Sequence, residues 1–207
     1  MTAPIDLGEP TKHLVVLAHP RAASFTRQVC DRYLDGVRSL GHTVVLRDLY
    51  AMKFDPVATA DEAFTRPAAD PAPDVRIEMD HLIAADVVTF IAPVWWIAPP
   101  AILKGWLDRV LRGGGFAYGY GPAGPRGLLA GKRGLVFTSS GSTEQEFIDS
   151  RKLDAIRVMW GVGTVEFCGI AMLDHLHFGP VGSRSKPEMI AGYLQQVQDC
   201  VRRHFGG

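Results

Sequence analysis

The chain has 207 residues, enough for one core, so we expect a flexible lead-in over residues 1–11 and a single domain over residues 12–207. Its 22 Lys and Arg residues balance its 22 Asp and Glu residues, which argues against nucleic acid or an anionic membrane as a partner. The three cysteines are widely spaced and the N-terminus has no apolar signal core, so we expect a cytoplasmic protein with free thiols.

Five short apolar, β-branched runs have the pattern of strands that are buried on both faces of a parallel sheet. In chain order they are residues 13–18, 43–46, 86–92, 132–140 and 163–170. Helical spacing of apolar residues predicts helices between and after these strands, over residues 25–40, 75–84, 99–112, 151–160 and 188–204. Ser24 is the expected N-cap of the first helix, and Gly41 the residue that ends it.

Two segments need separate comment. Residues 51–74 are rich in Pro, Ala and Asp without periodicity, and we interpret them as a surface excursion that would order only against a ligand or a second subunit. Residues 87–103 carry no charge, but Pro93, Pro99 and Pro100 favour a strand, a loop and a helix over a membrane span. We therefore expect no membrane insertion.

The alternation of strands and helices predicts an α/β fold, with a doubly wound five-stranded parallel sheet of order 2-1-3-4-5 and helices on both faces. In such a sheet the ligand crevice opens at the carboxyl ends of the first and third strands. His19, Pro93 and Thr138 fall at these ends and at the end of the fourth strand beside them.

The loop after the first strand leads into a helix N-terminus, where free N–H groups and the helix dipole favour an anion such as phosphate. Ser24 and Thr26 add hydroxyl groups and His19 an imidazole N–H. The same residues also suit an ordinary turn with a serine cap, and the loop is neither a Walker loop nor GxGxxG.

The loop after the third strand, Pro93-Val94-Trp95-Trp96-Ile97, offers backbone amides and wide aromatic faces of the kind that a flavin ring requires. Alternatively, the two tryptophans are anchors of the core or of a dimer interface. Because neighbouring side chains diverge, we expect at least one of them to face a cleft or a partner. The hydroxyl-rich turn over residues 138–142 is either a close approach to the same ring or a plain polar loop.

Other chemistries find less support. The serines at the strand ends lack the GxSxG elbow of many serine hydrolases. His175 and His177 would point to the same side of an alternating segment close to Asp174, but no further ligand cluster accompanies them, so we expect no metal.

Longer stretches carry a resemblance. Residues 99–110, Pro-Pro-Ala-Ile-Leu-Lys-Gly-Trp-Leu-Asp-Arg-Val, followed by Phe116-Ala117-Tyr118, resemble the signature of the NAD(P)H:quinone oxidoreductases of the flavodoxin-like superfamily. This family includes animal quinone reductases and bacterial quinone reductases ancillary to potassium efflux. Residues 48–56 and the loop with His19, Ser24 and Phe25 also look like family segments, so the resemblance covers residues 13 to about 201.

The resemblance implies a homodimer with one FAD or FMN per subunit, reduced by NAD(P)H and reoxidised by a quinone in the same pocket. The segment after the second strand favours FAD over FMN. Carried over by position, the flavin-binding residues would be His19, Ser24, Phe25, Thr26, Pro93, Val94, Trp95, Trp96, Ile97, Thr138, Ser139, Ser140 and Gly141. Trp96, Tyr118 and Tyr120 would contact the substrate, with both tyrosines reaching into the partner's pocket, and Trp106 would pack its helix onto the sheet.

The chain departs from the family in two places. Where the family typically has Thr-Thr-Gly-Gly, this chain has Thr138-Ser139-Ser140-Gly141, so an additional side chain projects there. The animal enzymes then place a tyrosine and a histidine, but the matching region of this chain, residues 144–152, contains neither. We therefore assign no catalytic residue and leave the hydride chemistry to the flavin. Two other functions stay open: an azo- or nitro-aromatic reductase on the same scaffold, and a flavin-binding regulatory subunit that docks onto a transporter.

Overall fold

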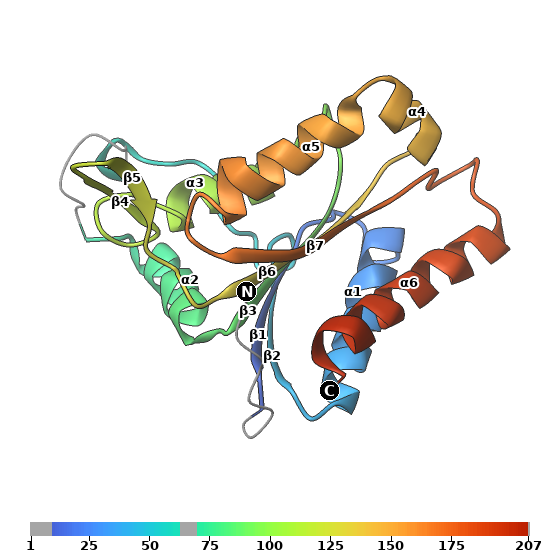
Figure 1. Cartoon of the computed structure of the whole chain (residues 1–207), viewed down its shortest axis with the longest axis horizontal. Helices are drawn as coiled ribbons and strands as arrows, with labels where there is room; N and C mark the ends of the chain where they lie inside the picture. Colours follow the sequence, from blue (N-terminus) through green and yellow to red (C-terminus); the bar gives the residue numbers. More distant parts are fainter. Residues whose placement is uncertain (1–9, 63–69, 207) are drawn as a thin grey trace.

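The computed structural model describes residues 10–62 and 70–206, so most of the expected lead-in over residues 1–11 lies outside the described residues. The central sheet has five parallel strands in the order β2-β1-β3-β6-β7, which confirms the predicted topology (Figure 1). Its strands are β1 (Lys12–Leu17), β2 (Thr43–Asp48), β3 (Val87–Pro93), β6 (Arg133–Ser139) and β7 (Ala171–Phe178). The helices are α1 (Phe25–Ser39), α2 (Pro73–Ala84), α3 (Ala101–Val110), α4 (Glu144–Asp149), α5 (Lys152–Trp160) and α6 (Pro187–Phe205), with short turns η1 (Ala60–Glu62) and η2 (Gly161–Val165).

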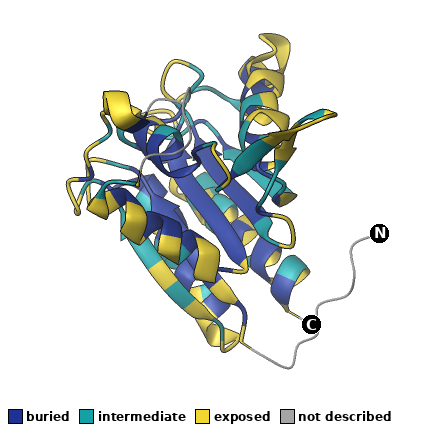
Figure 2. Cartoon of the chain, turned by 90° about the vertical axis from the view of Figure 1, so that its left-hand side faces the viewer, coloured by how far each residue is buried: buried dark blue, intermediate teal, exposed yellow. Residues whose placement is uncertain are grey.

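Helices cover both faces of the sheet because successive side chains of its buried strands point in opposite directions. In β1, Leu14 and Val16 pack in one core with α2, α3 and α5, whereas Val15 and Leu17 pack in the other with α1 and α6. Figure 1 shows α1 and α6 together on one side of the sheet, and Figure 2 shows buried strands between helices with exposed outer faces.

Local sequence explains how α1 and α3 are placed. The Ser24 hydroxyl oxygen accepts a hydrogen bond from the Arg27 N–H at 3.1 Å, so Ser24 is the N-cap of α1 as predicted. Trp106 of α3 is fully buried and meets the Phe90 ring edge-on at 5.7 Å, which confirms that it packs this helix onto the sheet.

The fifth strand was predicted wrongly. Residues 161–165 form a π-helical turn that extends α5, where the Thr164 hydroxyl donates to the Met159 carbonyl oxygen at 2.7 Å, and the strand begins only at Ala171. The strand β7 lies at the sheet edge and carries Asp174 and two histidines, so it is less apolar than the segment before it. Apolar character alone therefore selected the wrong segment.

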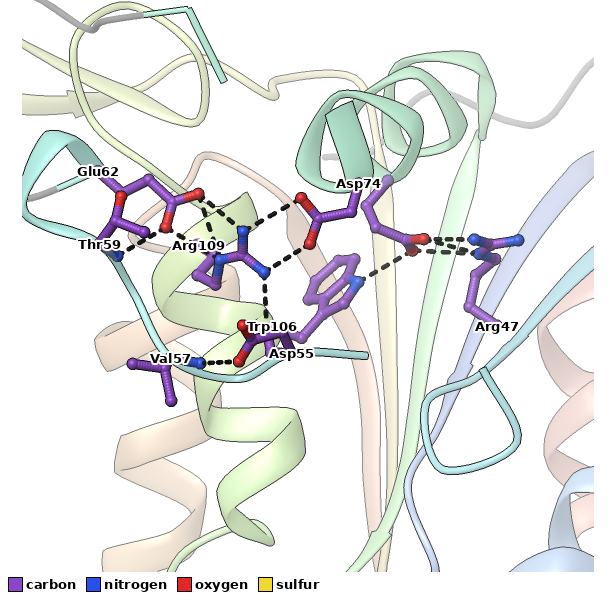
Figure 3. A network of polar contacts seen from close by, with 9 residues as sticks. Arg47, Asp55, Val57, Thr59, Glu62, Asp74, Trp106 and Arg109 are labelled. Carbon is purple, nitrogen blue, oxygen red and sulfur yellow. Dashed lines mark hydrogen bonds and ion pairs between the residues drawn. The ribbon is translucent and has the colours of Figure 1, made fainter. Parts of the chain in front are cut away.

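The predicted surface excursion is partly wrong as well, since the described part of it is held by the chain itself. Arg109 of α3 is 4% exposed and lies 2.9 Å from a Glu62 carboxylate oxygen and 2.6 Å from a carboxylate oxygen of Asp74. It also donates to the Asp55 carbonyl oxygen at 2.7 Å (Figure 3). This buried guanidinium joins residues 55–62 and the start of α2 to α3, with no ligand or second subunit required.

A second buried carboxylate continues the contacts toward β2. Glu78 of α2 is 1% exposed, accepts a hydrogen bond from the Trp106 indole N–H at 3.0 Å, and pairs with the Arg47 guanidinium (Figure 3). A buried carboxylate is stable only when its oxygens are satisfied, and here two elements supply the donors.

Residues 118–127 lie outside the predicted strands and helices, and they form a separate hairpin of β4 (Tyr118–Gly121) and β5 (Gly124–Gly127). Its position is set by close backbone contact, since a Cβ at Gly127 would lie 2.0 Å from the Gly169 nitrogen. Among the helices described, none is both long and apolar enough to cross a bilayer.

Candidate active site

A pocket of about 190 Å³ opens at the carboxyl ends of β1, β3 and β6, where the predicted order places the ligand crevice. Ten residues line it: His19, Phe25, Thr26, Pro93, Val94, Trp95, Ser139, Ser140, Gly141 and Val181. Nine of them are among the residues selected from the sequence. The structure thus brings together three loops that lie far apart in the chain.

The first wall is the N-terminus of α1. His19 Nδ1 accepts a hydrogen bond from the Arg21 N–H at 3.0 Å, so in the neutral ring the hydrogen is on Nε2 and is available as a donor. Burial lowers the pKa of His19, which favours this neutral form. Ser24 does not line the pocket, because its hydroxyl oxygen caps the helix.

The second wall is a tight turn after β3. Trp95 and Ala98 exchange two backbone hydrogen bonds of 2.9 and 3.0 Å, and the two residues between them have φ angles of 53° for Trp96 and 59° for Ile97. This left-handed conformation suits glycine, and for a β-branched residue it is strained. It directs the Trp96 side chain to solvent, where it is 100% exposed, so Trp96 does not line the pocket of its own subunit. Trp95 does line the pocket, so it is the tryptophan that faces a cleft as expected.

Contacts beneath the turn explain how it is held. Val94 and Ile97 pack against a small buried cluster of Phe147, Leu153 and Ile156 from α4 and α5. The Val94 N–H donates to the Ser139 carbonyl oxygen at 2.7 Å. Val94 and Trp95 therefore use their N–H groups within the chain, and not as the ligand donors that the sequence suggested.

The helix α4 was missed in the sequence although a signal for it was present. Thr143 and Glu146 form a capping box, in which each side chain accepts a hydrogen bond from the other residue's backbone N–H. Arg184 then pairs with the Glu146 carboxylate at 3.0 Å and donates to the Gly141 carbonyl oxygen. This residue, which the sequence did not indicate, joins α4 to the pocket loop.

The third wall is the loop after β6. Ser140 lines the pocket, and its hydroxyl oxygen lies 3.0 Å from His177 Nε2. The buried Thr138 hydroxyl does not line the pocket and lies 3.0 Å from His177 Nδ1 and 2.9 Å from His175 Nε2. The two histidines thus share a face of β7, as their spacing predicted, and contact hydroxyl groups at the end of β6 and in the loop that follows it.

Val181 was missed because it lies in an irregular segment after β7. Its N–H donates to the Ser140 carbonyl oxygen at 2.7 Å, which brings its side chain to the pocket. Close packing sets the same segment, since a Cβ at Gly179 would lie 2.1 Å from the Ser142 carbonyl oxygen.

Tyr118 and Tyr120 lie elsewhere. Tyr118 lines a second pocket of about 310 Å³ with Phe167 and Cys168, and no residue lines both pockets. Tyr120 is 79% exposed on the hairpin. In the described part of the chain, neither tyrosine contributes to the pocket of its own subunit.

One group of possible metal ligands lies apart from both pockets. Ligand atoms of Asp174, Cys200 and His204 fall within 4.8 Å of one another. The Asp174 carboxylate already pairs with the Arg203 guanidinium at 3.0 Å, and burial raises the pKa of the Cys200 thiol to about 12. The thiol of Cys200 is therefore protonated at neutral pH.

Comparison with known proteins gives the same fold and adds relatives. Residues 11–201 match the model of a family described as having a flavodoxin-like fold. The chain is 33% identical to an uncharacterised NAD(P)H oxidoreductase of Haemophilus influenzae, over 90% of this chain and 94% of that protein. It is 32% identical to human ribosyldihydronicotinamide dehydrogenase [quinone], over 90% of each chain.

A solved structure agrees. The NAD(P)H:quinone oxidoreductase from Methanothermobacter marburgensis superposes with a TM-score of 0.86 at 25% identity, over 94% of this chain and 98% of that chain. The sheet order, the pocket at the strand ends and these similarities lead to one assignment. The chain belongs to the NAD(P)H:quinone oxidoreductase family of flavodoxin-like proteins.

Proposed function

We propose that this chain is a flavin-dependent NAD(P)H oxidoreductase that reduces quinones by ping-pong, two-electron hydride transfer. The observation that carries the proposal is the pocket at the ends of β1, β3 and β6, which combines a helix N-terminus with an aromatic wall. The named activities of the human and Methanothermobacter marburgensis proteins support a quinone as acceptor.

The residues present fit a flavin nucleotide. His19 Nε2–H and the first N–H groups of α1 are donors suited to phosphate, beside the buried Thr26 hydroxyl. Trp95 and the small residues Ser139 to Gly141 would hold the flat ring between them. A bound flavin would supply the hydride chemistry, and the role of the chain is to bind it, orient both substrates and limit water.

The substrate pocket is completed by a second subunit in this proposal. Tyr118 and Tyr120 lie on a hairpin outside the pocket of their own chain, and Tyr120 is largely exposed. In a homodimer they would close the partner's pocket over nicotinamide or quinone, with Trp96 on the opposite side. We propose the cytoplasm as the compartment, in line with three cysteines that are all free and buried.

Two alternatives remain distinguishable. An azo- or nitro-aromatic reductase would show its highest kcat/KM with those acceptors in a panel that includes quinones. A regulatory subunit would bind flavin, yet its flavin absorbance would not bleach when NAD(P)H is added.

The central experiment identifies the cofactor. The protein is purified, heated to release any bound flavin, and the released compound is separated by chromatography, which distinguishes FAD from FMN. We favour FAD. Absence of flavin in the purified protein, and after reconstitution with either nucleotide, would contradict the proposal.

The dimer is tested separately. Tyr118→Ala should raise KM for the acceptor and leave the flavin content unchanged, since this side chain lies outside its own subunit's pocket. Loss of flavin together with acceptor binding would contradict the proposed role.

A further inference from the structure

The hydroxyl of Ser140 joins the candidate flavin pocket to a series of partly buried polar groups on β6 and β7. The series runs from Ser140 to His177, from His177 to Thr138, and from Thr138 to His175. His175 Nδ1, at its far end, is buried and has no hydrogen-bond partner. The unpartnered nitrogen of His175 determines where the hydrogens of this hydrogen-bonded series lie.

His175 donates to Thr138. A neutral imidazole carries one hydrogen, and a buried N–H without an acceptor is rarer than a lone pair without a donor. The hydrogen therefore lies on Nε2, at 2.9 Å from the Thr138 oxygen. The single hydrogen of Thr138 is then left for His177 Nδ1 at 3.0 Å or for the Leu176 carbonyl oxygen at 3.5 Å.

These two choices give His177 two tautomers. With its hydrogen on Nδ1, His177 donates to Thr138 and accepts the Ser140 hydrogen on Nε2, so Ser140 presents lone pairs to the pocket. With its hydrogen on Nε2, His177 donates to Ser140, whose own hydrogen is then free for the Ser142 carbonyl oxygen at 3.3 Å or for a ligand. Ser140 is an acceptor toward the pocket in the first case and a donor in the second.

The surroundings keep His177 neutral in both arrangements. Its ring stacks on the Phe147 ring of α4 with centroids 4.4 Å apart. The Lys152 ammonium lies over the Phe147 ring, 5.9 Å from its centroid. Burial, and then the positive charge of Arg157 on α5, lowers the pKa of His177 to about 4. The neighbouring His175 is also neutral, because burial lowers its pKa to about 3.

We propose that His177 is a positioning residue that switches Ser140 between hydrogen-bond donor and acceptor, so that the pocket can match a bound flavin in both its oxidised and its reduced form. The inference rests on the proposed function. A flavin gains N–H character or negative charge on reduction, so the two forms require different partners. Each hydroxyl and the ring keep one hydrogen in both arrangements, so the switch involves no net gain or loss of a proton.

The first test observes the ring in the wild-type protein. Histidine labelled with ¹⁵N gives different chemical shifts for the protonated and the unprotonated ring nitrogen, and His177→Phe or His177→Gln assigns the signals. Protein reconstituted with FAD or FMN is measured before and after anaerobic reduction. We expect the protonated nitrogen to change between Nδ1 and Nε2, and the same tautomer in both states would overturn the proposal.

The second test is a double-mutant cycle in flavin affinity. Ser140→Ala and His177→Phe are made singly and together, and Kd is measured for oxidised and for reduced flavin. Each single change should alter the ratio of the two Kd values by about tenfold, the size of one charge-assisted hydrogen bond. The double variant should change it no further, because His177 acts through Ser140.

A control and a failure criterion separate this inference from the function. Phe147→Leu removes the ring that stacks on His177 and that supports Val94 and Ile97 of the pocket turn, but leaves both hydrogen bonds. It should therefore lower stability and weaken the binding of both flavin forms alike, without changing the ratio of the two Kd values. If the two single changes alter the ratio of Kd values additively, the proposed role of His177 is overturned, but the proposed function of the protein is not. Failure of wild-type protein to bind either flavin would overturn the proposed function, and this inference with it.

Discussion

His13 should make the protein lose stability in mild acid. It lies on β1 with 1% exposure, and its ring nitrogens are 2.8 Å from the Tyr33 hydroxyl and 2.9 Å from His42 Nδ1. Burial, with smaller contributions from His42 and Arg133, lowers the pKa of His13 from 6.5 to about 3. Between these values the folded state keeps the ring neutral while the unfolded state takes up a proton.

The size of the effect follows from linkage. Stability that depends on this neutral ring is present above the unfolded pKa and is lost as pH falls toward the folded pKa. At about pH 5 the unfolded state has gained roughly 2 kcal/mol from protonating this one residue. That pH lies above the ordinary pKa of carboxyl groups, so histidines dominate the change.

Urea unfolding at about pH 7.5 and about pH 5, at one protein concentration, measures this loss of unfolding free energy. His13→Asn removes the titrating group, so the variant should lose roughly 2 kcal/mol less between the two pH values than wild type. Tyr33→Phe is the control, since it removes a hydrogen-bond partner but keeps the buried ring, and should lower stability by a similar amount at both pH values. An equal acid loss in His13→Asn and wild type would refute the reasoning.

Three further predictions concern other parts of the fold. Glu62→Gln removes a carboxylate from the buried Arg109 guanidinium and should lower the free energy of unfolding in urea by about 3 kcal/mol. Lys104→Ala breaks an exposed ion pair and should lower it by only roughly 0.5 kcal/mol, so equal losses would contradict the buried network. Gly179→Ala places a Cβ 2.1 Å from a carbonyl oxygen of the pocket loop and should weaken flavin binding about tenfold or more in a titration. Gly192→Ala, in open space on α6, should leave the affinity unchanged, and an unchanged affinity in both variants would contradict the close packing at Gly179. Trp96→Gly removes a side chain from a backbone with φ 53° and should raise the free energy of unfolding by about 1 kcal/mol while raising KM for the acceptor; a lower Tm would argue against strain in this turn.

The inner strands could be predicted because their apolar runs are buried on both faces. The strand β3 ends at Pro93, and His19 follows shortly after the end of β1, so both residues were placed correctly at the carboxyl ends of the strands. Most of the pocket lining was predicted with them. The edge strand β7 could not be found in this way, since Asp174, His175 and His177 make it as polar as a loop. Its position depends on pairing with β6, which no local pattern records.

The fine geometry of the site depends on contacts between distant residues. Nothing local marks Trp96 and Ile97 for a left-handed turn, because such residues avoid positive φ unless packing elsewhere holds them. No local pattern shows that Arg109 is buried, because its partners Glu62 and Asp74 lie far from it in the sequence. Long-range ion pairs of this kind are visible only in three dimensions.

The buried guanidinium of Arg109 also determines which parts of the molecule open together. Surface segments without regular structure usually exchange their amide hydrogens first, in local openings that leave the core intact. Here residues 55–62 cannot detach unless Arg109 gives up Glu62 and the Asp55 carbonyl, which also loosens its hold on Asp74 at the start of α2. This segment and the first turn of α2 therefore form one cooperative unit with α3, whose slow hydrogen exchange would resemble that of a helix more than that of a loop.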